Sequence, residues 1–127
     1  MAMGTFGFEN IIAWQKAHEF VLNVYKATRD FPKEERFGLT SQFRRAAVSI
    51  EANIAEGYKK LGKAGKLRFM NIAEGSLEEC RDYMVLARDL GYVKAAAFEM
   101  PCELAGQTGK LLYGYSNGIL RNNAIKD

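Results

Sequence analysis

Apolar and small residues recur every three or four positions through residues 39–60, and this spacing predicts a helix with one apolar face. The residues on that face are Leu39, Phe43, Ala46, Ala47, Ile50, Ile54, Gly57 and Tyr58. Steps of three and four place side chains on one stripe of a helix with 3.6 residues per turn. Thr40 or Ser41 is the expected N-terminal cap, because a hydroxyl oxygen there can accept a hydrogen bond from a free backbone N–H group.

A second line of side chains on the same helix is polar in the middle of its span. Its members, also at helical spacing, are Arg45, Ser49, Asn53 and Glu56. Ser and Asn are poor residues inside helices because their side chains compete for backbone hydrogen bonds. These polar side chains therefore either pair with polar groups of a neighbouring helix or simply lie on a solvent-exposed side of the helix. If it pairs, we expect Asn53 to be mostly buried, with its amide bonded to Glu74 or Ser76 on the third helix.

Three further segments have helical periodicity. Residues 11–30 form the first, which ends before Pro32 because the residue before a proline disfavours the helical conformation. Residues 66–90 have the most regular pattern, and Gly91 is the expected C-terminal cap. A fourth helix starts near residue 94 or 95, and either Pro101 lies in its first turn or the helix kinks there. The glycine-containing residues 61–65 are expected to form a loop.

These four helices with short connections predict an all-α fold, an up-down-up-down antiparallel four-helix bundle. Residues 1–8 are expected to be a loose lead-in to this single domain, and residues 122–127 a polar tail. The third helix carries a second apolar stripe, formed by Phe69, Ile72, Ser76, Tyr83, Leu86 and Leu90. Because a face this wide exceeds what one neighbouring helix covers, we expect it to contact another subunit of a homo-oligomer.

Composition excludes several classes of protein. A chain of 127 residues forms one domain that can bury a core without disulfides or metals. No apolar run approaches the roughly 20 residues needed to span a membrane. The N-terminus lacks the basic and apolar regions of a signal peptide, so we expect a cytoplasmic protein with no membrane contact. Cys80 and Cys102 form no ligand motif and fall in apolar stripes, so both are expected to be core thiols.

The chain has no pattern typical of a catalytic, metal or cofactor site. His18 is the single histidine, and a metal site in a helical bundle needs more than one, so we expect it to be a satisfied side chain. The third helix carries the acidic group Glu74, Glu78, Glu79 and Asp82. A catalytic carboxylate pair is one interpretation, but pairing with Arg44, Arg45 or Arg81 is favoured. We therefore expect no enzymatic activity and no cofactor.

One cluster of charge indicates a binding function. Five basic residues with no acid among them surround the glycine-containing loop: Lys59, Lys60, Lys63, Lys66 and Arg68. Such a patch can contact the phosphates of RNA or DNA. The alternative is a loop kept soluble by lysines. The formal net charge of +3 permits contact with nucleic acid but does not by itself argue for it.

Two long motifs identify a family resemblance. The segment LTSQFRRAAVSIEANIAEG starts at Leu39, and FMNIAEGSLEE starts at Phe69. Together with the WQKA segment at Trp14 and the Leu-Gly-Tyr corner around Gly91, they resemble the four-helix bundle family named for a protein encoded in intervening sequences of bacterial 23S ribosomal RNA genes. The resemblance runs from about residue 8 to 120. The fourth helix departs from it, through Pro101 and several glycines.

The resemblance implies a bundle that assembles into a homopentameric ring and has no enzymatic activity. It also implies likeness to the accessory variability protein of diversity-generating retroelements, a basic pentameric barrel that binds its reverse transcriptase and nucleic acid. The family's motif residues carry over by position, as structural or assembly residues: Arg44, Arg45, Asn53, Glu56, Glu74 and Ser76. The expected function is that of a nucleic-acid-binding or scaffolding accessory protein. A purely structural protein–protein assembly module is the alternative.

Overall fold

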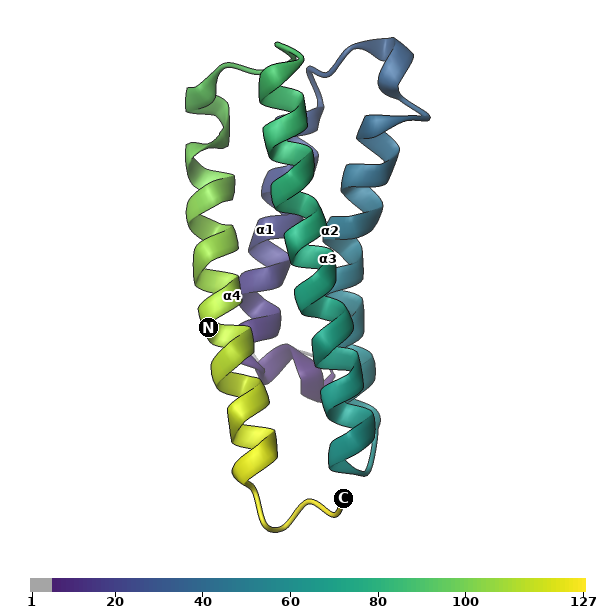
Figure 1. Ribbon diagram of the computed structural model, residues 1–127, viewed down its shortest axis with the longest axis vertical. Helices are drawn as coiled ribbons and strands as arrows, with labels where there is room; N and C mark the ends of the chain where they lie inside the picture. Colours follow the sequence, from purple (N-terminus) through teal and green to yellow (C-terminus); the bar gives the residue numbers. More distant parts are fainter. Residues whose placement is uncertain (1–5) are drawn as a thin grey trace.

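The computed structural model describes residues 6–127, and four long helices account for most of them (Figure 1). The helices are α1 (Ile12–Thr28), α2 (Leu39–Lys59), α3 (Lys63–Asp89) and α4 (Glu99–Arg121). Short 3-10 helices lie before α1, α2 and α4: η1 (Gly7–Asn10), η2 (Lys33–Glu35) and η3 (Ala95–Phe98). Each long helix packs against the next, and α4 packs back against α1. The expected antiparallel four-helix bundle is confirmed, and the described residues include no strand.

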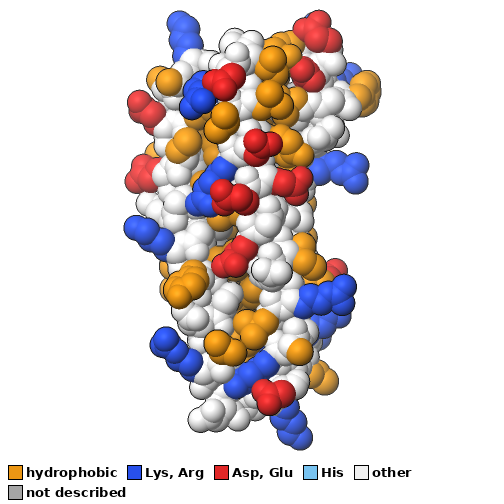
Figure 2. All heavy atoms as spheres, viewed as in Figure 1, with side chains coloured by type: hydrophobic (Ala, Val, Ile, Leu, Met, Phe, Trp, Pro, Cys, Tyr) orange, Lys and Arg blue, Asp and Glu red, His pale blue; other side chains and the backbone are white. Residues whose placement is uncertain are grey.

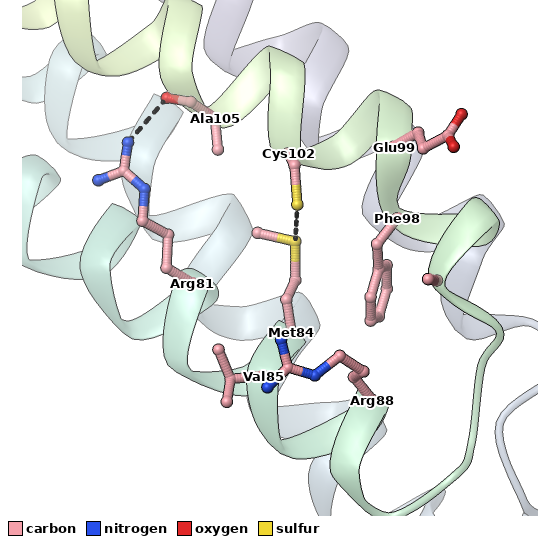
Figure 3. A pocket seen from close by; sticks show the side chains of 9 residues that line it. Arg81, Met84, Val85, Arg88, Phe98, Glu99, Cys102 and Ala105 are labelled. Atoms are coloured by element: carbon pink, nitrogen blue, oxygen red, sulfur yellow. Dashed lines mark hydrogen bonds between the residues drawn. The ribbon is translucent and has the colours of Figure 1, made fainter.

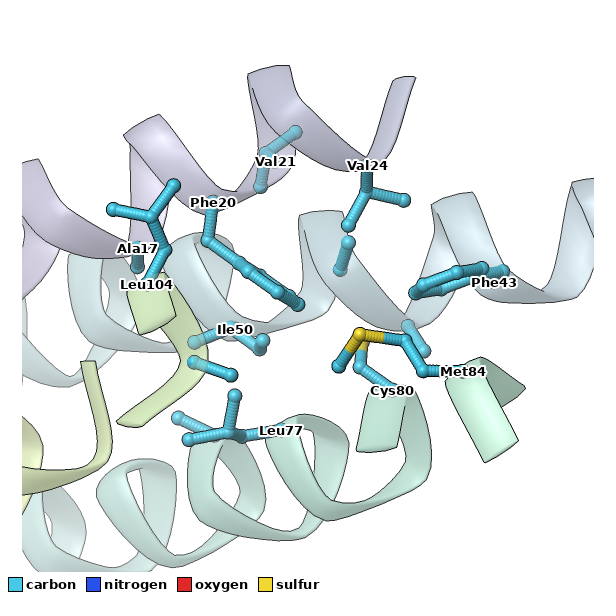
Figure 4. Packing of buried hydrophobic residues seen from close by; sticks show 14 of the residues in the cluster. Ala17, Phe20, Val21, Val24, Phe43, Ile50, Leu77, Cys80, Met84 and Leu104 are labelled. Carbon is cyan, nitrogen blue, oxygen red and sulfur yellow. The ribbon is translucent and has the colours of Figure 1, made fainter. Parts of the chain in front are cut away.

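The core lies along the axis of the bundle and follows the periodic stripes (Figure 4). Each helix contributes side chains that are almost completely buried. They include Phe20 and Val24 from α1, Phe43, Ile50 and Ile54 from α2, Met70, Leu77 and Cys80 from α3, and Leu112 from α4. Side chains three and four residues apart lie on the same face of a helix, so a single stripe per helix supplies this packing.

The start of α2 differs from the expected hydroxyl cap. Neither Thr40 nor Ser41 caps the helix, because α2 begins at Leu39 and its N-cap residue is Gly38. The carboxylate of Glu35 instead accepts a hydrogen bond from the Leu39 backbone N–H at 3.1 Å. An acidic group at a helix N-terminus also interacts favourably with the helix dipole. The same carboxylate accepts a hydrogen bond from the Tyr92 hydroxyl at 2.6 Å. This bond joins the α1–α2 connection to the α3–α4 connection.

The C-terminus of α3 has the glycine cap expected from the sequence. Gly91 has a φ of +77°, in the left-handed region that residues with a side chain rarely adopt. Its N–H donates to the carbonyl of Arg88, and the N–H of Tyr92 donates to that of Ala87. This pair of bonds is the Schellman motif, which satisfies carbonyls left open at a helix end.

The loop expected over residues 61–65 is shorter than the sequence indicated. Helix α3 begins at Lys63, three residues before the expected position, and Gly65 lies inside it. The Lys63 N–H donates to the carbonyl of Lys126 at 2.7 Å, so the C-terminal segment caps this helix start. Gly65 lies against the side chain of Lys60, whose Cβ would be 3.3 Å from a Cβ added at the glycine. Packing between the turn and the first turn of α3 therefore favours helix over loop.

Pro101 is the third residue of α4 and lies in its first turn, as one of the two sequence alternatives proposed. A proline there sacrifices no hydrogen bond, because the first N–H groups of a helix have no partner within it.

Of the expected lead-in, residues 1–5 lie outside the described part, whereas Phe8 packs its ring 5.3 Å from that of Trp14. In the C-terminal segment, Ile125 packs against the core. No helix within residues 6–127 has the length and hydropathy of a membrane span.

Candidate functional site

The basic cluster lies at the end of the bundle where α2 turns into α3 and where α4 ends (Figure 1, lower end). Lys59 is the last residue of α2, and Lys60 lies in the turn. The other three members, Lys63, Lys66 and Arg68, belong to the first two turns of α3. The face in Figure 2 shows Lys and Arg side chains around this lower end, whereas most of its acidic side chains lie higher.

Two members of the cluster bind carbonyl groups of the protein itself. Lys66 donates from Nζ to the carbonyl of Tyr58 at 2.8 Å, and Lys63 donates from Nζ to that of Leu120 at 2.9 Å. These carbonyls lie in the last turns of α2 and α4, where backbone acceptors are unpaired and the helix dipole is negative. Partial burial lowers the pKa of Lys66. Part of the positive charge therefore stabilises helix ends.

The remaining members face outward. Lys60 lies over the ring of Phe69, with Nζ 5.1 Å from the ring centroid. The side chains of Lys59 and Arg68 are exposed and make no hydrogen bond or ion pair within the described residues. The fold also brings Arg121 and Lys126 to this end. The sequence alone did not group these two with the cluster, because Arg121 ends α4 and Lys126 follows it, and both are far from residues 59–68 in the chain.

The polar line of α2 reaches α3 through a serine pair. The hydroxyls of Ser49 and Ser76 are 2.9 Å apart. Asn53 is half-buried rather than exposed to solvent, but the partner expected for it on α3 was wrong: its amide donates to the carbonyl of Ser49 at 2.7 Å and to the Ser49 hydroxyl at 3.0 Å. A short side chain reaches the carbonyl four residues earlier in its own helix more easily than a neighbouring helix. Ser49 therefore links Asn53 to Ser76.

The two arginines of the motif lie on different sides of α2. Arg44 faces α1: its Nε donates to the hydroxyl of Thr28 at 2.8 Å, and its guanidinium lies 4.6 Å from the ring centroid of Tyr25. Arg45 is exposed and lines a polar hollow of about 590 Å³ between α2 and α3, together with Ser49 and Ser76. Within the described chain neither arginine pairs with an acidic residue, so that part of the favoured interpretation was wrong.

The two acidic motif residues are not near each other. Glu56 is exposed at the rim of a hollow beside Phe6 and Phe8. Glu74 is half-buried and lines another hollow, between α3 and α4, with Lys110. The motif residues thus do not converge on one site. They are distributed over the surfaces that join α2 to α1 and to α3, the surface between α3 and α4, and the exposed face of α2.

Some of the remaining titratable groups form local pairs. Glu78 pairs with Arg81 at 2.8 Å, as expected for the acidic group of α3. His18 is satisfied, as expected, with Nδ1 3.1 Å from a carboxylate oxygen of Glu51. No group of three or more potential metal ligands occurs in the part of the chain that the structure describes.

The two cysteines have different environments. Cys80 is buried in the core, as expected, and burial raises the pKa of its thiol to about 12. Cys102 was expected in the core but is exposed. It is the fourth residue of α4, where its side chain is directed toward α3 at a hollow in the surface rather than at the bundle axis, with Sγ 4.0 Å from Sδ of Met84. Apolar periodicity did not distinguish these two positions.

Comparison with known proteins identifies the family. Residues 9–114 match the family of the 23S rRNA-intervening sequence protein. Among solved structures, the fold is similar to that of a protein with unknown function from the S23 ribosomal protein family of Bacteroides thetaiotaomicron, with a TM-score of 0.76 and 21% identity over 84% of this chain and 96% of that one. No functionally curated protein matches the sequence. Because the family match spans most of the chain, the protein belongs to the 23S rRNA-intervening sequence protein family.

Proposed function

We propose that the protein is a non-enzymatic, oligomeric accessory protein of the cytoplasm that binds nucleic acid through the basic end of its bundle. The observation that carries the proposal is the convergence at one end of Lys59, Lys60 and Arg68, which face outward, with Arg121 and Lys126. Phosphate contacts from such side chains need no base recognition, so binding is independent of sequence and weakens with salt. The family's name refers to an insertion in ribosomal RNA and is consistent with an RNA partner.

Oligomerisation is part of the same proposal. The outer stripe of α3 leaves Ile72, Leu86 and Leu90 between 41% and 50% exposed, and apolar side chains aligned on one helix face can be covered by another subunit. We propose that this stripe packs against another copy of the chain and that the assembly is a homopentamer. Each copy then adds one basic end, and several weak sites on one assembly gain affinity through multivalency.

The test is fluorescence anisotropy with labelled RNA and DNA at several salt concentrations. Lys63 and Lys66 stay unchanged because they stabilise helix ends. The variant is Lys59→Glu with Arg68→Glu, which reverses two exposed charges. Its matched control is Lys33→Glu with Arg36→Glu, two exposed positions near η2 at the opposite end of the bundle.

We expect the wild type to bind both nucleic acids at low salt, with log affinity falling linearly with log salt concentration. The Lys59/Arg68 variant should lose most of this affinity and have a shallower salt dependence, whereas the control variant should keep both. Absence of binding by the wild type at low salt contradicts the proposal. Equal losses in the two variants contradict the assignment to this end of the bundle.

The oligomer has its own measurement, sedimentation velocity of the wild type and of Leu86→Glu. A pentamer that the charged variant dissociates, with unchanged helical circular dichroism, is the expected result. A wild-type monomer at micromolar concentration contradicts the assembly. If the pentamer forms but no nucleic acid binds, the favoured function becomes a protein–protein scaffold, as the exposed apolar stripe of α3 also permits. Copurification with a reverse transcriptase or with ribosomal RNA would then name the partner.

A further inference from the structure

A hollow between α3 and α4 lies at the end of the bundle opposite the basic cluster (Figure 3). Its volume is about 450 Å³, within the range of small-molecule sites in proteins. The wall is mainly apolar and sulfur-containing: Met84 and Val85 on the α3 side, and Phe98, Cys102 and Ala105 on the side of η3 and α4. The hollow exists because the α4 positions that face α3 here carry the small side chains Cys102 and Ala105, which do not fill the space between the helices.

Two arginines of α3 flank this hollow, and their hydrogen bonding differs. Arg81 uses both terminal amino groups, one to Glu78 at 2.8 Å and one to the carbonyl of Ala105 at 3.3 Å. Arg88 donates only from Nε, to the adjacent Asp89 at 2.9 Å. Within residues 6–127 its two terminal amino groups have no hydrogen-bond partner. Arg88 therefore keeps a pair of donors whose fork geometry matches a carboxylate.

The acidic residue beside the hollow does not oppose an anion there. Glu99 lies at its edge, but Figure 3 shows its carboxylate directed away from the space between the helices. The interior thus presents apolar atoms and two sulfur atoms, with unused guanidinium donors at one side. This combination is complementary to a molecule with an apolar body and one anionic group.

We propose that this hollow is a binding site for a small amphipathic carboxylate, such as a medium-chain fatty acid. The carboxylate pairs with the terminal amino groups of Arg88. The acyl chain lies against Met84, Val85 and Phe98, and Met84 adapts to its shape because an unbranched thioether side chain has several accessible rotamers. Apolar burial supplies most of the affinity, and the ion pair supplies the preference for an anion.

The two cysteines provide the readout. Cys102 lines the hollow and is exposed, whereas Cys80 is buried with a raised pKa, so iodoacetamide should alkylate only Cys102 in the folded protein. The rate of this alkylation is measured by mass spectrometry with increasing octanoate or decanoate, kept below the critical micelle concentration. Decanol and decyltrimethylammonium are the neutral and cationic probes of the same chain length.

We expect decanoate to protect Cys102 in a saturable manner and to bind about tenfold more tightly than decanol, the contribution of one charge-assisted bond. Arg88→Gln should remove that tenfold preference while leaving protection by decanol. Arg36→Gln is the matched control, because Arg36 is exposed in the α1–α2 connection at the same end of the bundle. It should behave as the wild type. Val85→Phe, which adds volume to the hollow from a half-exposed position, should weaken protection by both molecules.

Three results overturn the proposal. The first is a Cys102 that iodoacetamide cannot reach in the native protein, because the hollow is then covered. The second is failure of decanoate to protect Cys102. The third is equal protection by decanoate, decanol and decyltrimethylammonium, or an unchanged preference in Arg88→Gln, because the site then has no selectivity for an anion.

Discussion

Lys66 of α3 donates a hydrogen bond from Nζ to the backbone carbonyl of Tyr58 in the last turn of α2, at 2.8 Å. The same ammonium group is 3.4 Å from the carbonyl of Gly57 and 5.8 Å from the centroid of the Tyr58 ring. A residue from the basic cluster thus serves as the C-terminal cap of the preceding helix. Within this cluster, Lys63 and Lys66 bind backbone carbonyls and so contribute to stability. Lys59 is instead exposed to solvent.

The first prediction is that substitutions of these two kinds of lysine have different effects on stability. We expect Lys66→Ala to lower the free energy of unfolding by about 1 kcal/mol, because the carbonyls at the end of α2 lose a charged donor. Lys59→Ala should change it by less than about 0.5 kcal/mol, because that side chain is exposed and has no partner in the described structure. Urea denaturation followed by circular dichroism measures both. Equal effects of the two substitutions would contradict the capping role.

A second prediction concerns the hydrogen bond of 2.6 Å from the Tyr92 hydroxyl to Glu35. This bond, with a smaller effect of the Leu39 N–H, lowers the pKa of Glu35 from its ordinary value of 4.5. The bond to Glu35 also raises the pKa of Tyr92 above its ordinary value of 10.0. We expect Tyr92→Phe to lower the melting temperature at neutral pH, whereas Tyr113→Phe, at an exposed position on α4, should not.

The pH dependence of this bond follows from the two shifts. Stability from a carboxylate with a lowered pKa is complete above the unfolded value of 4.5 and is lost as the pH falls through the folded value. Stability from a phenol with a raised pKa is complete below 10.0 and is lost as the pH rises through the folded value. The difference in melting temperature between wild type and Tyr92→Phe should therefore be largest between these limits and shrink toward both. A difference that stays constant into acid would show that Glu35 is not the partner.

The sequence predicted the bundle because helical periodicity reports which face of each segment is buried. It also predicted the glycine cap at Gly91, since few residues other than glycine adopt a positive φ. It did not predict the start of α3, because Gly62 and Gly65 are typical of a loop when read alone. The bond from the Lys63 N–H to Lys126 that fixes this start joins residues 63 positions apart, and such contacts leave no local pattern.

The candidate sites were less predictable than the fold. Proximity in the chain was enough to find the outward-facing Lys59, Lys60 and Arg68, but Arg121 joins them only through the topology of the bundle. Periodicity also cannot choose between a partner on a neighbouring helix and one on the same helix, which is why Asn53 was misassigned. The hollow beside Cys102 arises from the volume that small side chains fail to fill, a property of the packed structure.

A third prediction compares two buried threonines. Thr28 uses its hydroxyl fully: it donates to the Val24 carbonyl at 2.8 Å and accepts from Nε of Arg44. Thr108 is completely buried, and its hydroxyl has no hydrogen-bond partner among the described residues. Leaving partners unpaired costs free energy, whereas replacing an unpaired hydroxyl by a methyl group removes a penalty. We expect Thr28→Val to destabilise the protein by about 1–3 kcal/mol and Thr108→Val to stabilise it by about 1 kcal/mol.

Urea denaturation of the two variants decides the comparison, because valine has nearly the shape of threonine in both. The double variant Thr28→Val with Arg44→Met tests the mechanism at the first position. Removing both partners should cost less than the sum of the single effects, since each change leaves the other group without its bond. Destabilisation by Thr108→Val would show that its hydroxyl is paired in solution.

The last prediction concerns the crossing of α2 and α3 near the basic end, where Gly57 is buried. A Cβ added at this position would lie 2.5 Å from Cε of Met70, 3.0 Å from Cβ of Phe69 and 3.3 Å from the Lys66 carbonyl oxygen. The methionine end can move, but the other two atoms belong to the α3 backbone or are attached to it. Gly75, which is exposed in the middle of α3, has no atom within 4 Å of an added Cβ.

These environments give the same substitution opposite effects. Alanine is favoured over glycine inside a helix by roughly 0.5–1 kcal/mol, so Gly75→Ala should stabilise the protein by about that amount. At Gly57 the crowding reverses the sign, and we expect Gly57→Ala to destabilise by about 1–3 kcal/mol, because α3 must move away from α2. Urea denaturation of both variants measures the difference. A stabilising Gly57→Ala would mean that the two helices separate at no cost, and that the close approach at Gly57 does not hold the basic residues of α2 and α3 together.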